Sequence, residues 1–190
     1  MKYTKIPTNA FKTLTVNAGI IAKHFDTSTG EVLDADILGA TSGGIKFSAV
    51  PAFKDWGEDI DNCPKNSKEL KRIEDWEITL SGSFVSAGED ALTALLAAAD
   101  NTESIKPRRD LKAEDFLDEL WLIADYGDKD GDYIAIELKN ALSTGGLALQ
   151  TADKEKGKFD FTFTAHYSLA DQDNVPCEVF LKTTPDSPTE

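Results

Sequence analysis

The residues best suited to metal chemistry lie in one acidic run, Asp128–Asp132, with Glu137 five residues further on. This run matches a calcium-binding EF-hand loop at its third, fifth, sixth and twelfth positions. However, Tyr126 occupies the first position, where a carboxylate ligand is needed, and the flanking residues alternate like strands rather than helices. We therefore interpret the run as an Asp/Gly hairpin turn and expect no metal site. Weak calcium binding remains the alternative, and calorimetry would test it.

The side chains of other common catalytic and metal sites are present but are not suitably spaced. Cys63 and Cys177 are far apart in sequence, as are His24 and His166, so neither pair has the short spacing of a zinc site. We expect two free thiols. The chain has no Gly-x-Ser-x-Gly motif, and its Gly39–Gly44 segment lacks the lysine of a phosphate-binding loop. We therefore expect no catalytic residue and no cofactor, and predict that the protein is not an enzyme.

The composition narrows the range of partners. The chain has 190 residues, which favours one domain, and 34 acidic against 20 basic residues give a net charge of −14. Sequence-specific nucleic-acid binding needs a basic surface, and the densest basic cluster is only Lys106–Arg109. No apolar run approaches the ~20 residues of a membrane span, and no apolar signal segment follows Met1. We expect a protein made in the cytoplasm, with no membrane partner.

Turn residues divide the sequence into short alternating segments, the pattern of an antiparallel β-protein. Only Glu89–Ala99 has helical spacing, with Leu92, Leu95, Leu96 and Ala99 on one stripe. The predicted fold is mainly β: an antiparallel β-sandwich or barrel of about eight strands with one flanking α-helix. The predicted strands are 18–25, 45–50, 77–85, 119–126, 133–142, 147–151, 158–167 and 177–182, with turns at 41–44, 127–132 and 153–157 and a connecting loop over 105–115.

Three predicted strands have one apolar and one polar face. In 77–85, Ile78, Leu80 and Phe84 point inwards, and in 158–167 a phenylalanine row does so. In 133–142 we expect Ile134, Ile136 and Leu138 inside and Ala135, Glu137 and Lys139 outside. A polar sheet face of this kind is usually an ordinary solvated surface. The alternative is a hydrophilic sheet that lines a channel.

One long segment, 53–72, shows no clear periodicity. Unstructured loops of this length are uncommon in compact domains and are often functional. Its apolar residues Trp56, Ile60 and Leu70 argue against simple disorder. We divide the chain into an N-terminal arm over 1–17, one β-domain over 18–182 that contains this loop, and a loose C-terminal tail over 183–190.

Three runs of the sequence resemble the major tail proteins of long non-contractile-tailed phages of Gram-positive bacteria. These are Gly39–Pro51 (GATSGGIKFSAVP), Asp55–Asn66 (DWGEDIDNCPKN) and Trp76–Val85 (WEITLSGSFV). The helical segment that follows, Leu92–Ala98, continues the match. The resemblance covers roughly residues 18–182 and is a pattern of ordered segments, with no catalytic signature.

The resemblance implies a structural subunit of a virion tail. Such subunits form hexameric rings that stack into a tube, and their strands join into one inner barrel through which DNA passes to the host without specific binding. The implied partners are further copies of the chain and the tail tip, tape measure and terminator proteins. Segment 53–72 would stack on the next ring, and strands 77–85 and 133–142, with 45–50 beside them, would face the lumen. The implied stacking residues are Trp56, Asp59, Ile60, Asp61, Pro64 and Leu70, and the implied lumen residues are Glu77, Thr79, Ser81, Ser83, Glu137 and Lys139.

An acidic lumen wall would repel phosphates only near its surface, because the Debye length at physiological salt is ~8 Å. Lys46 and Lys139 make the implied wall less than uniformly acidic. Two alternatives remain open at this stage. One is a contractile or secretion-type tube of the same fold. The other is a carbohydrate-binding or adhesion β-sandwich, although its phenylalanines occupy core positions rather than an exposed platform.

Overall fold

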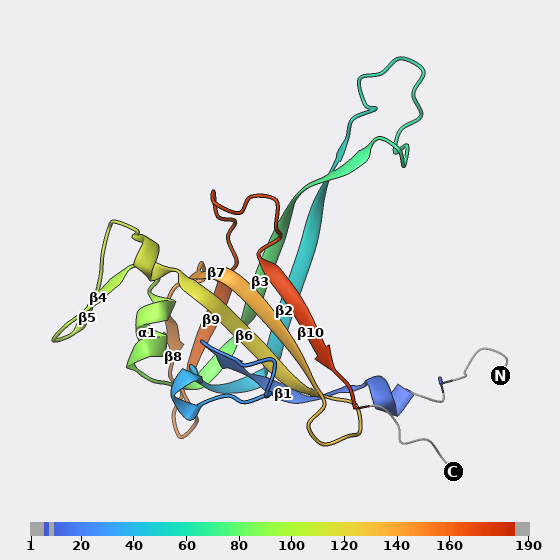
Figure 1. The fold of residues 1–190 in the computed structure, drawn as a ribbon. Helices are drawn as coiled ribbons and strands as arrows, with labels where there is room; N and C mark the ends of the chain where they lie inside the picture. The colour runs from blue at the N-terminus through green and yellow to red at the C-terminus, as the bar shows by residue number, and fades with distance from the viewer. Residues whose placement is uncertain (1–5, 8–9, 185–190) are drawn as a thin grey trace, which may run out of the picture.

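The fold is mainly β, with strands as its principal regular elements (Figure 1). The computed structural model describes residues 6–7 and 10–184, so most of the predicted 183–190 tail and part of the predicted 1–17 arm lie outside the described residues. The strands are β1 (Thr15–Ala22), β2 (Gly39–Asp55), β3 (Lys71–Ala87), β4 (Ala99–Asn101), β5 (Ile105–Pro107), β6 (Leu117–Tyr126), β7 (Tyr133–Ser143), β8 (Ala148–Gln150), β9 (Lys158–Thr164) and β10 (Cys177–Lys182). The helices are α1 (Glu89–Leu95) and three short 3-10 turns, Ala10–Thr13, Asp34–Asp36 and Ala113–Asp115.

Eight of these strands form one antiparallel sheet with the order β1-β6-β7-β9-β3-β2, and β10 and β8 branch from β7 and β9. The sheet curls until its two ends meet, since the amide of Leu38 donates to the carbonyl of Ile21 at 3.0 Å and Ala22 bridges Ile37. The result is a nearly closed barrel with α1 at its side. The predicted fold class is therefore confirmed.

The barrel interior holds the residues that the alternation placed there. Ile78, Leu80 and Phe84 of β3 are fully buried, and Phe161 and Phe163 of β9 pack against them. Leu95 closes the core from α1. Burying side chains of this size contributes about 1.5–3 kcal/mol each, so these strands hold the barrel together.

β7 is buried on both faces, contrary to the prediction that Ala135 lies on a polar face. Ala135 is fully buried in a second cluster with Phe25, Trp121 and Tyr133. This cluster forms because the β1–β2 connection brings Phe25 back over the outer face of β6 and β7. The periodicity of a single strand cannot reveal that a segment distant in the sequence packs over its polar face.

The helix and several connections differ from the prediction at their ends. Helix α1 ends at Leu95 rather than at residue 99, since Ala97 adopts a left-handed φ of 61° and the chain then enters β4. Its buried residues are Ala91 and Leu95 rather than the whole predicted leucine stripe. Strand β1 begins at Thr15, inside the predicted arm, and the predicted 105–115 loop contains β5 and a 3-10 turn.

The predicted turn over 41–44 is a bulge within β2. Thr41 pairs with Phe84, and Ile45 pairs with Gly82, so the residues between them bulge out of the ladder. Gly43 and Gly44 have φ values of 84° and 85°, which only glycine adopts without strain. Glycines that signal a turn also fit a bulge, and here the strand continues beyond them.

Candidate assembly interface

The β2–β3 hairpin extends far beyond the barrel (Figure 1). Its strands have 17 residues each and remain paired out to Asp55 and Lys71. The prediction of a loop over the whole of 53–72 is therefore wrong at both ends, because Phe53–Asp55 and Lys71–Arg72 are strand residues. We call residues 53–73 the arm, and residues 56–70 its tip.

The tip is an ordered series of turns anchored on Asp55. One carboxylate oxygen of Asp55 accepts the amide of Gly57 at 2.9 Å, and the other accepts the amide of Asn66 at 2.8 Å. These two backbone hydrogen bonds favour the charged carboxylate and lower the pKa of Asp55. Asn62 and Asn66 supply left-handed turns with φ near 60°. The tip thus holds a defined shape without regular secondary structure.

A small packed centre supports these turns. Gly57 is buried, and a side chain there would approach both the Cys63 sulfur and Leu70 Cδ1 to 2.9 Å. The amide of Trp56 donates to the carbonyl of Leu70 at 3.1 Å, which closes the base of the tip. Leu70 is therefore partly buried within the arm itself. The thiol of Cys63 is free, as is that of Cys177 in β10.

The structure brings the predicted stacking residues together at the tip and leaves most of them exposed. Trp56 and Ile60 are 64% and 52% exposed. Asp59, Asp61 and Pro64 are exposed too. Two further apolar residues of the arm, Phe53 and Ile73, are also exposed. They were not predicted as interface residues, because strand alternation by itself does not reveal that the hairpin leaves the barrel before reaching them.

A groove runs along the arm beside Trp56. Trp56, Leu70 and Ile73 form its apolar lining, and its charged lining is Lys54, Arg72 and Glu74. The Lys54 ammonium lies 5.4 Å from the Trp56 ring centroid and 3.5 Å from Glu74. The Arg72 guanidinium donates to the backbone carbonyls of Glu69 and Lys71 at 3.0 Å each. The groove therefore combines an apolar lining with net positive charge.

A second surface, which we call the hydroxyl face, covers the outside of β2, β3 and β9. Four predicted lumen residues, Glu77, Thr79, Ser81 and Ser83, share this face. Their strand partners are also small and polar: Thr79 pairs with Ser48 and Thr164, and Ser81 with Lys46 and Thr162. The face thus presents short hydroxyl side chains with few charges.

The other two predicted lumen residues lie elsewhere. Glu137 and Lys139 belong to β7, which β9 separates from β3. Glu137 pairs with Trp121 and Glu178, and burial raises the pKa of its carboxyl group. The structure therefore does not place Glu137 and Lys139 on the hydroxyl face.

Strand edges are available for pairing with another chain. Among the described strands, β2 pairs with β3 alone and β10 pairs with β7 alone. The contact with β1 involves Ile37 and Leu38, just before β2, so the rest of the β2 edge is open. Pro51 lies in β2, which suits an edge strand because proline has no amide to donate. Long open edges favour association with a further strand.

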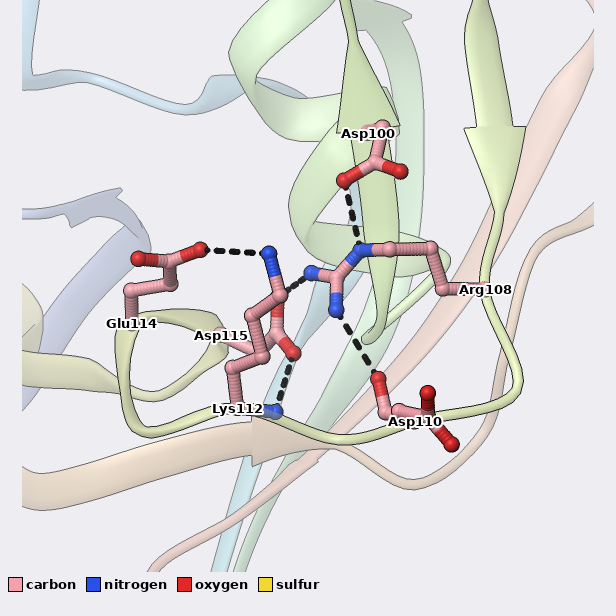
Figure 2. Close-up of polar contacts among 6 residues, drawn as sticks. All are labelled: Asp100, Arg108, Asp110, Lys112, Glu114 and Asp115. Carbon is pink, nitrogen blue, oxygen red and sulfur yellow. Dashed lines mark hydrogen bonds and ion pairs between the residues drawn. The ribbon is translucent and has the colours of Figure 1, made fainter.

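The most concentrated ionic cluster of the described residues surrounds Arg108 (Figure 2). Its guanidinium pairs with Asp100 at 2.7 Å and with the buried carboxylate of Asp115, and donates to the carbonyl of Asp110 at 2.8 Å. Asp115 also accepts the amide of Lys112 at 2.7 Å. The contacts join the β4–β5 hairpin to the turn before β6, so we interpret the cluster as a structural clamp.

Histidine and acidic-turn residues have structural partners as well. The Nδ1 atom of His24 lies 2.5 Å from Glu119, which also accepts the Trp121 indole N–H at 2.6 Å. Glu119 thereby raises the pKa of His24. In the 127–132 hairpin, Asp132 accepts both the amide and the hydroxyl of Thr184. Within residues 6–7 and 10–184, no group of three His, Cys, Asp or Glu side chains is placed to hold a metal ion.

No protein-family model matches this sequence, and no curated protein matches it significantly. In the described part of the chain, no helix is both long and apolar enough to cross a membrane.

Proposed function

We propose that this chain is the structural subunit of a phage tail tube, which assembles into stacked hexameric rings and encloses a channel for DNA delivery. The observation that carries the proposal is the arm. Phe53, Trp56, Ile60 and Ile73 each leave half or more of their surface exposed on one projecting hairpin. Apolar and aromatic residues of this kind dominate interface energetics, so a lone subunit leaves its best binding surface uncovered.

Two other features support the same assignment. The open edge of β2 allows strand pairing between copies, which would remove an aggregation-prone edge. The hydroxyl face adjoins this edge, so ring closure through β2 would place Thr79, Ser81 and Ser83 on one shared wall. Such a wall, together with the net charge of −14, fits a channel that passes DNA without binding it.

Negative-stain electron microscopy of the purified protein over a concentration series tests the proposal. We expect rings or tubes of uniform width to appear as concentration rises, with a matching increase in sedimenting mass. Monomers that persist at all concentrations and conditions would overturn the proposal. Monomers that also bind glycans would support the adhesion alternative, which the exposed indole of Trp56 beside a partly polar groove favours.

A further inference from the structure

The groove of the arm and an acidic segment lie at opposite ends of the same strand. The segment is residues 31–36, which lead directly into β2, whereas the arm is the continuation of β2 at its other end. A strand of 17 residues spans roughly 50 Å at about 3.3 Å per residue. Two complementary surfaces at opposite ends of a subunit give a head-to-tail contact that does not close on itself.

Residues 31–36, which we call the acidic knob, combine an exposed leucine with three acidic residues. Leu33 is 66% exposed between Glu31 and Asp34. No lysine, arginine or histidine occurs anywhere from residue 25 to residue 45. Among the described residues, no ion pair involves Glu31, Asp34 or Asp36. The knob thus places an exposed leucine among three acids, of which Asp36 also interacts electrostatically with His24.

The arm groove has the opposite character. Its lining is apolar at Trp56, Leu70 and Ile73, and its cations are Lys54 and Arg72. Arg72 has no carboxylate partner within the described chain, because its guanidinium contacts backbone carbonyls only. Lys54 pairs with Glu74 at 3.5 Å, but both side chains are more than half exposed, and such pairs contribute little. An incoming carboxylate would find both cations accessible.

We propose that the acidic knob of one copy docks into the arm groove of a copy in the adjacent ring, with Leu33 against Trp56 and Ile73 and with Asp34 and Asp36 facing Lys54 and Arg72. This inference rests on the proposed tube function and names the partner of the arm. Charge complementarity at such a contact sets its register and suppresses wrong pairings.

Two other exposed leucine segments fit less well. Leu169 lies in the connection after β9. β9 runs antiparallel to β3, and just after it the amide of Ala165 donates to the carbonyl of Ile78. The connection therefore begins on the side of the barrel that faces the arm, which is the wrong end. Leu149 of β8 is 55% exposed and lies at the correct end. However, the turn that follows β8 contains Lys154 and Lys156 beside its acids. Of these three segments, only the knob lies at the far end of β2 and contains no basic residue.

Charge reversal provides the test. One variant carries Lys54→Glu and Arg72→Glu, and the other carries Asp34→Lys and Asp36→Lys. Each alone would place like charges together at every ring contact, so we expect at least about a tenfold higher critical concentration for sedimenting polymer. In a mixture, stacks in which the two reversed proteins alternate bring opposite charges together at each contact. We therefore expect the mixture to polymerise where neither protein does alone.

Controls separate this proposal from the tube function itself. Asp153→Lys with Glu155→Lys changes the net charge as much as the knob reversal does, but at the β8 turn, and should polymerise like the wild type. Leu33→Ser should impair polymer growth, whereas Leu149→Ser should not. If wild-type tubes form but the reversed proteins assemble normally alone, or fail to assemble when mixed, the knob contact is wrong and the tube function stands. If the wild type forms no polymer at all, both proposals fail.

Discussion

Phe53 pairs directly with Ile73 across the β2–β3 hairpin, yet both side chains remain at least half exposed. In a closed barrel, such a cross-strand apolar pair normally packs against an opposing layer. Here the hairpin has already passed beyond the barrel, and the Lys71 ammonium lies over the Phe53 ring, 4.8 Å from its centroid. The proposed assembly would cover this pair, whose exposed surface contributes little to the stability of the lone subunit.

Two phenylalanines should respond oppositely to truncation. Phe163 is 1% exposed in the barrel core, so Phe163→Ala should lower the free energy of unfolding by roughly 3–5 kcal/mol. Phe53→Ala should change it by no more than about 0.5 kcal/mol while reducing polymer formation. Urea unfolding of the monomer and sedimentation of the polymer provide the two readouts. A large stability loss in Phe53→Ala would mean that the arm belongs to the core.

The tip residues Trp56 and Ile60 should be required for tube growth. The double variant Trp56→Ala, Ile60→Ala removes the two exposed apolar side chains of the tip that were predicted as stacking residues, without touching the buried core. We expect a folded monomer, with unchanged far-ultraviolet circular dichroism, that no longer forms tubes. Leu111→Ala with Leu149→Ala is the matched control, since both leucines are about as exposed as Ile60 but lie outside the arm. Normal polymerisation of the tip variant would refute the stacking role.

The order of the arm tip should depend on acidic pH through Asp55. The amides of Gly57 and Asn66 lower its pKa in the folded state. The stabilisation is therefore complete above the pKa of an unfolded aspartate, about 3.9, and is lost as pH falls through the lower folded-state value. We expect the amide resonances of Gly57 and Asn66 to shift together below pH ~3.9, a transition that Asp55→Asn should abolish. Titration of both amides at the ordinary aspartate value would contradict the anchoring role.

The ion pairs of Arg108 should contribute far more to the free energy of unfolding than the neighbouring exposed pair of Lys112 and Glu114. The side chains of Arg108 and Asp115 are 14% and 6% exposed, so Arg108→Ala leaves a buried carboxylate without its cation and should cost about 3 kcal/mol. Lys112→Ala removes only the exposed pair with Glu114 and should change stability by at most about 0.5 kcal/mol. Thermal unfolding measures both. Equal effects would mean that Asp115 does not depend on Arg108.

The sequence by itself predicted the inward-facing residues of β3 and β9 and the position of one hairpin turn. Alternation over 158–167 predicted the inward phenylalanines of β9, and alternation over 77–85 predicted the buried residues of β3. Glycine and aspartate predicted the 127–132 hairpin, where the amide of Tyr126 donates to the carbonyl of Asp132. These features depend on period-two patterning and local turn chemistry, both of which are properties of neighbouring residues.

Only the tertiary structure decided which faces are covered. Ala135 is buried because Phe25, more than a hundred residues earlier, folds over it, and Phe53 is exposed because the β2–β3 hairpin extends beyond the barrel. The predicted turn over 41–44 is a bulge at Gly43 and Gly44 within β2. The ends of the predicted 53–72 loop are paired strand residues, out to Asp55 and Lys71, so β2 and β3 form one continuous hairpin. Burial depends on contacts between segments that are distant in the sequence, and a local pattern of residues does not determine which distant segments will pack against it.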